Sequence, residues 1–125
     1  NDTLIGGAGK DALTGGLGKD LFVFNAALGA TNIDTIKDYS TAADTIRLEN
    51  AIFTKLTTAG VLNAANFVTG AAAVDANDYL VYNSGTGALY YDADANGAGA
   101  AVQFATVFAS GTTLATLSAA EFVVI

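Results

Sequence analysis

The chain contains two consecutive nonapeptides, GGAGKDALT at residues 6–14 and GGLGKDLFV at residues 15–23. Both follow the pattern G-G-x-G-x-D-x-U-x, in which U is a large apolar residue, and this repeat is typical of a calcium-binding parallel β-roll. The preceding residues NDTLI supply the last five positions of a further unit, with Asp2 and Leu4 in phase. A flexible linker has no reason to repeat aspartate and a large apolar residue in this way. A phosphate-binding loop is also excluded, because neither G-K-[ST] nor a helical pattern follows the glycines.

Each letter of the repeat has a physical role. The glycines allow sharp backbone turns in which several carbonyl oxygens point to one centre, and the aspartate adds negative charge. Calcium accepts about six to eight oxygen ligands in irregular geometry, so this donor set suits it. Consecutive units turn on opposite edges of a roll, and Asp2 and Asp20 are therefore expected to stack on one edge. Stacked strands lie about 4.8 Å apart, so neighbouring carboxylates need a cation between them.

The repeat ends after Val23, and another segment must close the roll. The best candidates are residues 33–39 (IDTIKDY) and 44–48 (DTIRL), where acidic residues alternate with β-branched ones as in strands. We expect Asp34 to complete the last calcium site, with Asp38 and Asp44 as further candidate ligands. The alternative is that all three are solvated charges on a strand face.

The remainder predicts short antiparallel strands. Residues 78–83 and 88–92 are separated by the turn sequence SGTG, which indicates a hairpin, and residues 101–108 extend it. A short helix is expected at 51–58. The related heptapeptides LNAANFV (62–68) and LSAAEFV (117–123) each predict a capped turn leading into a strand, and the second carries a Ser118–Glu121 capping box.

The predicted fold class is therefore all-β, with little helix. Residues 1–24 are expected to form the end of a parallel β-roll, and residues 25–125 an antiparallel meander or sandwich that caps it. We expect one compact domain. Because the chain lacks methionine and starts within a repeat, the sequence also suggests a C-terminal piece of a longer protein.

A second candidate metal site lies at residues 92–97, DADANG, which fit the first six positions of an EF-hand loop. Its candidate ligands are Asp92, Asp94 and Asn96. The match weakens afterwards, because Gly99 stands at the normally apolar position 8 and Gln103 where a bidentate glutamate belongs. The alternative is a tight turn between two strands.

Composition narrows the possible functions. The 125 residues carry a formal charge of −7 and contain neither cysteine nor histidine, which argues against disulfides, zinc sites and the commonest general base. The acidic balance argues against nucleic acid as a partner. We find no apolar run that could span a membrane and no signal peptide. Only carboxylate chemistry would remain for catalysis, and calcium binding explains the aspartates better, so we expect no enzymatic activity.

Charge is distributed unevenly along the chain. All five basic residues lie within the first 55 positions, and the last 70 contain none. The chain ends in a carboxylate followed by four apolar residues, EFVVI. An exposed apolar strand would promote aggregation unless it is paired, so this terminus is expected to complete a sheet.

Taken together, these residues resemble the C-terminal region of RTX (repeats-in-toxin) proteins, including serralysin-type proteases, lipases and adhesins, which Gram-negative bacteria export through type I secretion systems. The resemblance rests on the two GGxGxD units, on the DTIKDY and LYYDAD stretches, and on the acidic-then-apolar end. It implies a secreted or cell-surface location and an upstream portion that carries the parent protein's activity. It also implies calcium binding by turn carbonyls and aspartates, with the ligands Asp2, Gly6, Gly7, Gly9, Asp11, Gly15, Gly16, Gly18 and Asp20. In this family the transporter reads an uncleaved C-terminal region, here Glu121, Phe122, Val123, Val124 and Ile125. The chain departs from the family in having few repeats.

An alternative function is a binding module. Tyr79, Tyr82, Tyr90 and Tyr91 on a small sheet could offer a stacking face to a polysaccharide, and the parent protein would then use this end to hold a surface. Strand alternation places Tyr79 and Tyr82 on opposite faces, so at least two of the four tyrosines are expected in the core.

Overall fold

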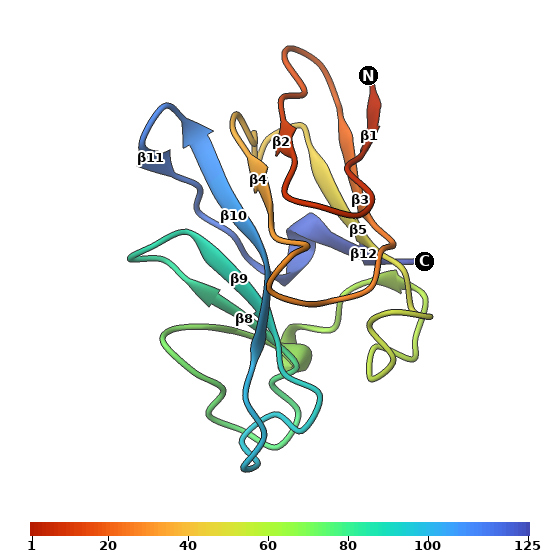
Figure 1. The fold of residues 1–125 in the computed structure, drawn as a ribbon, viewed down its shortest axis with the longest axis vertical. Coiled ribbons are helices and arrows are strands. Elements are labelled where there is room, and N and C mark those ends of the chain that lie inside the picture. Colours follow the sequence, from red (N-terminus) through yellow and green to blue (C-terminus); the bar gives the residue numbers. More distant parts are fainter.

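The computed structural model describes all residues, 1–125, and contains two β-sheets and two short 3-10 helices. The first sheet has five strands, in the order β1 (Thr3–Ile5), β3 (Leu21–Phe24), β5 (Thr45–Leu48), β12 (Phe122–Val124) and β6 (Gly60–Val61). The second sheet has the order β2 (Ala12–Leu13), β4 (Asp34–Ile36), β10 (Val102–Ser110), β9 (Ala88–Tyr91), β8 (Leu80–Asn83) and β7 (Phe67–Thr69), with β11 (Thr113–Leu114) paired to β10. The predicted all-β class is confirmed (Figure 1).

The nonapeptides form the expected parallel roll. Successive rungs alternate between the sheets, so β1 pairs in parallel with β3 in the first sheet and β2 pairs in parallel with β4 in the second. The strands β4 and β5 come from the two segments expected to close the roll. Since β3 also pairs in parallel with β5, regular stacking continues to Leu48, beyond residue 24.

The cap differs from the predicted antiparallel meander, because it is mixed. The antiparallel part is the hairpin β8–β9 with β10 and β11. However, β10 joins β4 in parallel, β12 joins β5 in parallel and β7 joins β8 in parallel. Both sheets of the roll are thus continued by strands from the end of the chain, which makes roll and cap one sandwich.

The predicted helix at residues 51–58 is wrong. This segment forms turns, with hydrogen bonds from the Phe53 N–H to the Glu49 carbonyl and from the Leu56 N–H to the Phe53 carbonyl. Phe53 and Leu56 are buried, whereas Ala59 is exposed. Burying Phe53 in the core holds the segment in turns and overrides the helical spacing. Both capped turns are confirmed, as helices η1 (Ala64–Asn66) and η2 (Ala119–Glu121), and Ser118 and Glu121 form the capping box.

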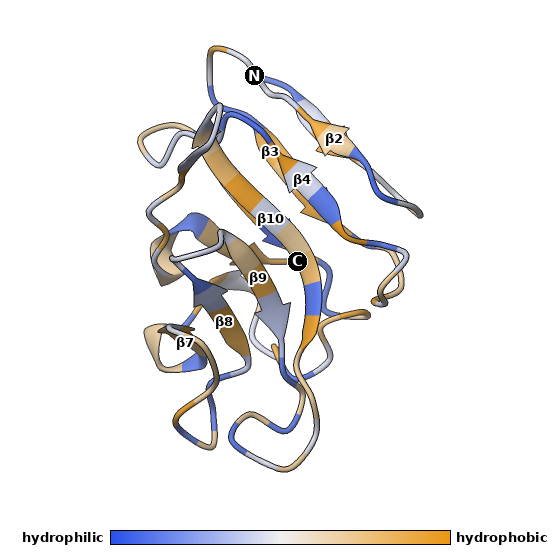
Figure 2. Cartoon of the chain, turned by 60° about the vertical axis from the view of Figure 1, so that its left-hand side comes forward, coloured by the Kyte–Doolittle hydropathy of each residue, from blue (hydrophilic) through white to orange (hydrophobic).

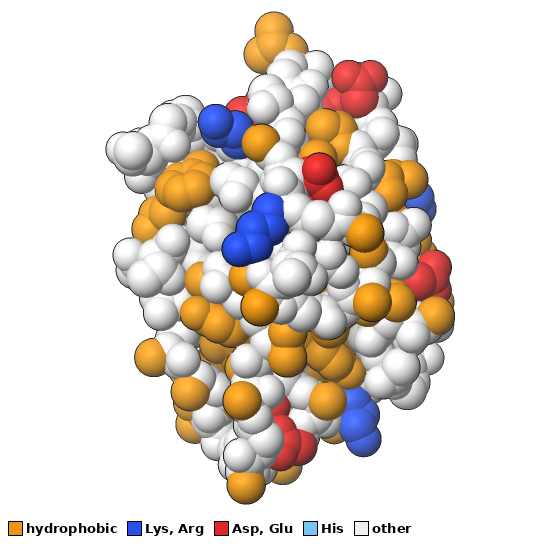
Figure 3. Space-filling model, viewed as in Figure 1, with side chains coloured by type: hydrophobic (Ala, Val, Ile, Leu, Met, Phe, Trp, Pro, Cys, Tyr) orange, Lys and Arg blue, Asp and Glu red, His pale blue; other side chains and the backbone are white.

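One core lies between the sheets and contains 22 buried residues. Phe24 of the first sheet packs edge-on against Phe104 of the second, with ring centroids 5.2 Å apart, and Phe53 contacts Phe104 at 5.0 Å. In Figure 2 the hydrophobic colour runs along strands such as β3, β8 and β10. Hydrophobic atoms on the surface in Figure 3 are interspersed with polar ones. Because the apolar strands form the core between the two sheets, the polar turns of the roll lie at the edges of the sandwich.

Candidate metal centre

The turns of the roll stack on two edges. On the first edge, the turn 15–20 lies between residues 1–2 and the segment 38–44. On the second edge, the turn 6–11 stacks on the segment that ends in Asp34. Gly16 and Gly18 have φ angles of 83° and 124°, and Gly7 and Gly9 repeat this geometry at 79° and 116°. A side chain with a Cβ rarely adopts such angles, so these positions need glycine.

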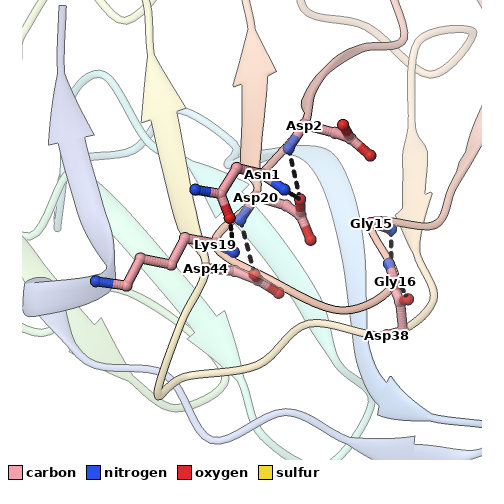
Figure 4. Close-up of polar contacts among 8 residues, drawn as sticks. All are labelled: Asn1, Asp2, Gly15, Gly16, Lys19, Asp20, Asp38 and Asp44. Carbon is pink, nitrogen blue, oxygen red and sulfur yellow. Dashed lines mark hydrogen bonds and ion pairs between the residues drawn. The ribbon is translucent and has the colours of Figure 1, made fainter.

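The aspartates form a ladder that connects stacked turns. The Asp2 N–H donates to Asp20 Oδ1 at 2.7 Å, and the Asp20 N–H donates to Asp44 Oδ1 at 3.0 Å (Figure 4). On the second edge the Asp11 N–H donates to Asp34 Oδ1, also at 3.0 Å. One carboxylate oxygen of Asp20, Asp34 and Asp44 therefore holds the neighbouring turn.

Two carboxylate oxygens at these turns are buried without a hydrogen-bond partner, Asp11 Oδ2 and Asp20 Oδ2. Asp20 is completely buried. An unpartnered buried polar atom is costly, and a buried charge more so. These two atoms belong to the aspartates of the two complete nonapeptides. Each of the two turns therefore contains one buried carboxylate oxygen that lacks a partner.

The first glycine of each unit makes room beside these oxygens. A Cβ placed on Gly6 would lie 2.5 Å from Asp34 Oδ2 and 3.1 Å from Asp11 Oδ2. A Cβ on Gly15 would lie 2.7 Å from Asp20 Oδ2. Carboxylate oxygens and backbone are thus brought together in a space that any larger residue would fill.

This donor set fits a hard divalent cation. It consists of oxygen alone, which calcium prefers, and the glycine turns add carbonyl oxygens. No point in the structure gathers three or more His, Cys, Asp or Glu side chains. The carboxylates at each turn would therefore hold calcium only together with backbone carbonyls, as the repeat predicts.

Protein cations do not neutralise these carboxylates. The single ion pair joins the Asn1 amino group to Asp20 Oδ1 at 3.5 Å. The Lys19 side chain extends away from Asp20 and Asp44, although its N–H donates to the Asn1 side chain (Figure 4). The charge of the stacked aspartates is left largely uncompensated.

The three further candidate ligands have different positions. Asp34 lies beside Asp11, as expected, and Asp44 follows Asp20 while also accepting the Ser40 N–H at 2.8 Å. Asp38 instead accepts the Gly15 and Gly16 N–H groups, at 2.9 and 2.7 Å. Asp38 thereby holds the backbone of the second turn, and both of its oxygens have donors.

Sequence reasoning missed Asn32, whose Oδ1 accepts the Gly9 N–H at 2.8 Å. The same separation of 23 residues relates Asn32 to Gly9, Asp34 to Asp11 and Asp38 to Gly15. A search for that offset, in place of the 18 residues between Asp2 and Asp20, could have found it.

Burial raises the pKa of Asp34. The hydrogen bond from the Asp11 N–H opposes this increase, and the negative charge of Asp11 adds to it. At the other edge, burial followed by the charges of Glu121 and Asp44 raises the pKa of Tyr39, whose hydroxyl donates to the Asp44 carbonyl.

Without metal, acidification from neutral pH towards the unfolded pKa of Asp34 is expected to increase the folded fraction. A carboxyl such as Asp34, with a higher pKa in the folded state, stabilises that state fully below its unfolded pKa of about 3.9. This contribution is lost as pH rises through the folded pKa. Circular dichroism of metal-stripped protein at constant ionic strength measures the response, which Asp34→Asn should weaken. With saturating calcium the sign should reverse, because protons compete for the ligands. A β-sheet signal that falls on acidifying the metal-free chain would contradict the expectation.

The loop predicted as a second metal site follows β9. Asp92 is buried, with Oδ1 unpartnered, whereas Asp94 and Asn96 are exposed. Burial and contact with Asp94 raise the pKa of Asp92, and contact with Asp92 and the Gly99 N–H lowers that of Asp94. The flanking elements are strands, as expected.

The C-terminal residues are part of the core sheet. Strand β12 lies between β5 and β6, and Phe122 and Val124 are 0% and 2% exposed. Glu121 accepts the Ser118 N–H in the capping box at 2.7 Å. The expectation that this terminus is paired is confirmed, and the pairing is on both sides.

The tyrosines do not form an open stacking face. Tyr82 and Tyr91 are buried, as expected for two of the four. Tyr79 and Tyr90 are half-buried, and neither pocket of the structure is lined by tyrosine. The polysaccharide alternative has no groove with exposed aromatic side chains to support it.

Comparison with known proteins gives a family. The family described as Peptidase M10 serralysin C terminal matches residues 2–105. That range includes both nonapeptides, the segments that close the roll and the β9–β10 loop. No curated protein matches the chain. No helix in the structure combines the length and apolar character needed to cross a membrane.

Proposed function

Because the chain belongs to the Peptidase M10 serralysin C-terminal family, we propose that it is the calcium-binding C-terminal domain of a secreted RTX protein. Its role is to fold on meeting calcium outside the cell and to carry the export signal of its parent. The domain itself is non-catalytic. The observation that carries this proposal is the pair of buried, unpartnered oxygens, Asp11 Oδ2 and Asp20 Oδ2, each beside the first glycine of a nonapeptide.

The stacked turns give this role a mechanism. Asp11, Asp20, Asp34 and Asp44 must approach one another before the rungs of the roll can hydrogen-bond. In a chain of net charge −7, this approach is opposed by repulsion. Calcium, when bound, supplies the positive charge that offsets this repulsion, and its binding free energy contributes to folding. Extracellular calcium modules bind with Kd of roughly 10⁻⁴ to 10⁻³ M, so such turns stay open in a calcium-poor cytosol.

The C-terminal strand supports the export part of the proposal. Phe122 and Val124 are inaccessible in the folded domain, so a transporter can read them only in an unfolded chain. An acidic roll that stays open inside the cell would leave Glu121–Ile125 available. Closure outside the cell would bury the signal and hinder backward movement through the transporter.

The Asp20→Asn variant tests the binding part. Asparagine is nearly isosteric with aspartate, but it removes the negative charge of the carboxylate whose Oδ2 lacks a partner. We therefore expect the calcium affinity of this turn to fall about tenfold or more. Loss of a residue that only supports a metal ligand already costs about tenfold, and Asp20 is a proposed ligand. In calcium the variant should be less stable than the wild type, whereas in chelator the difference should vanish or invert, because a buried charge has been removed.

Isothermal calorimetry and thermal denaturation, each with and without calcium, provide the measurements. Asp75→Asn is the matched control, since Asp75 is an exposed aspartate outside the roll. Equal affinity and stoichiometry for Asp20→Asn and the control would refute calcium binding at this turn.

A further inference from the structure

The loop between β9 and β10, residues 92–101, lies at the end of the molecule opposite the N-terminus (Figure 1). Acidic side chains are visible at this end in the space-filling view of the same orientation (Figure 3). No basic residue occurs after Lys55 in the sequence. Residues 92–101 belong to none of the stacked turns of the roll, so those turns do not account for the acidic groups of this loop.

Asp92 is the most constrained member of this loop. Its N–H donates to the Tyr79 carbonyl at 2.8 Å, which continues the β8–β9 ladder and fixes the start of the loop. The residue is 6% exposed, and its Oδ1 is buried without a hydrogen-bond partner. Burial raises the pKa of its carboxyl, and the neighbouring Asp94 carboxyl adds to this increase. Two neighbouring carboxyls, one of them buried, are stabilised either by a bound cation or by a proton that they share.

The rest of the loop is closed around Asp94. The Gly99 N–H donates to Asp94 Oδ2 at 2.6 Å, and the Gly97 N–H donates to the Asp94 carbonyl at 2.9 Å. A Cβ on Gly97 or Gly99 would lie 2.6 or 2.7 Å from Asp94 Oδ2. Asp94 itself is exposed. The buried carboxyl of Asp92 therefore has an exposed carboxyl as its neighbour in the loop.

Asn96 adds a neutral oxygen. Its Nδ2 donates to the Val74 carbonyl at 3.3 Å, and its Oδ1 has no donor in the protein. This contact also joins the β9–β10 loop to the loop of residues 74–78, where Asp78 Oδ2 accepts the Val74 and Asp75 N–H groups. A cation bound by the β9–β10 loop would thus also restrict the motion of the loop of residues 74–78.

From these contacts we propose that Asp92, Asp94 and Asn96 form a second type of calcium site, separate from the stacked turns. The ligands are oxygen atoms only, which suits calcium. The site lacks the bidentate glutamate of an EF-hand, because Gln103 lies in β10 and its side chain donates to Ala105 and Thr106. Water completes the coordination, and the affinity is correspondingly low, with Kd of roughly 10⁻⁴ to 10⁻³ M.

The test counts ions on the full chain. Native mass spectrometry in millimolar calcium is expected to show one ion fewer for Asp94→Asn than for the wild type. Asp94 is exposed, so this variant should fold. Asp92→Asn should lose the same ion, whereas Asp75→Asn, in the adjacent loop, should retain it. In a calcium titration followed by NMR, the Gly97 and Gly99 amide resonances of the wild type should shift, and Asp94→Asn should abolish these shifts.

An unchanged ion count in both variants would overturn the proposal, and would mean that the two carboxyls share a proton. Gly97 and Gly99 amides that do not move up to about 10 mM calcium, a concentration above the expected Kd, would also overturn it. These results are independent of the roll. Asp20→Asn should leave the loop ion in place, and Asp94→Asn should leave the calcium-dependent change in circular dichroism intact.

Discussion

Removal of calcium with a chelator is expected to convert the circular dichroism spectrum at 37 °C from that of a β-sheet protein to that of a disordered chain. The reason lies in Asp11 and Asp20, whose buried oxygens have no donor, and in their stacked neighbours Asp34 and Asp44. Without a cation these carboxylates repel one another across the rungs of the roll. Because β4 and β5 of the roll pair with β10 and β12, loss of the roll also exposes the core.

The size of this effect follows from linkage. Calcium at about 10 to 100 times Kd stabilises the folded state by about 1.4 to 2.7 kcal/mol per site. Two turn sites would then contribute about 3 to 5 kcal/mol, comparable with the whole stability of many domains, about 5 to 15 kcal/mol. Where the metal-free chain retains structure in the cold, its Tm should lie on the order of 10–20 °C below that of the calcium form.

Magnesium provides the control for this experiment. Magnesium requires a nearly regular octahedron and retains its water, so equal concentrations should not restore the β-sheet spectrum. Identical spectra and melting temperatures in chelator and in calcium would show that the roll folds without metal. The proposed switch would then be untenable.

Truncation of Phe122 to alanine is expected to destabilise the calcium-bound domain by about 3–5 kcal/mol, the usual cost of removing a buried phenylalanine. Phe122 is 0% exposed, and its ring centroid lies 5.5 Å from that of Phe67. Val123→Ala is the matched control, because this half-buried side chain points to the other face of β12 and should cost about 1 kcal/mol or less. Chemical denaturation at saturating calcium measures both. Equal losses for the two variants would contradict the buried position of Phe122.

Deletion of residues 122–125 should prevent folding even in calcium, since it removes the strand between β5 and β6. Comparison of this deletion with Phe122→Ala in a secreting cell separates the role of the terminus in folding from its role in export. Phe122→Ala should still be exported although it folds poorly, because most of the terminal segment remains. The deletion should abolish export. If the deleted protein were exported normally, the terminus would have a structural role only.

Much of the roll was predictable because its information is local. Glycines at fixed positions, one aspartate and one large apolar residue per unit determine the turn, its charge and its buried side chain. The hairpin at Ser84–Gly87 and the capping box at Ser118–Glu121 are local in the same sense, and both were predicted. The helix at 51–58 was not, because burial of Phe53 outweighed the helical spacing.

Which distant segments of the chain pair with one another could be seen only in the tertiary structure. The nonapeptide sequence by itself determined where the aspartates would sit within each turn and which ion chemistry would suit them. Only the folded chain decided that Asp38 holds glycine amides and that β10 and β12 extend the sheets of the roll. Strand pairing across the chain depends on a shared core between Phe24, Phe104 and Phe122, and no short-range pattern specifies which of many apolar strands will meet there.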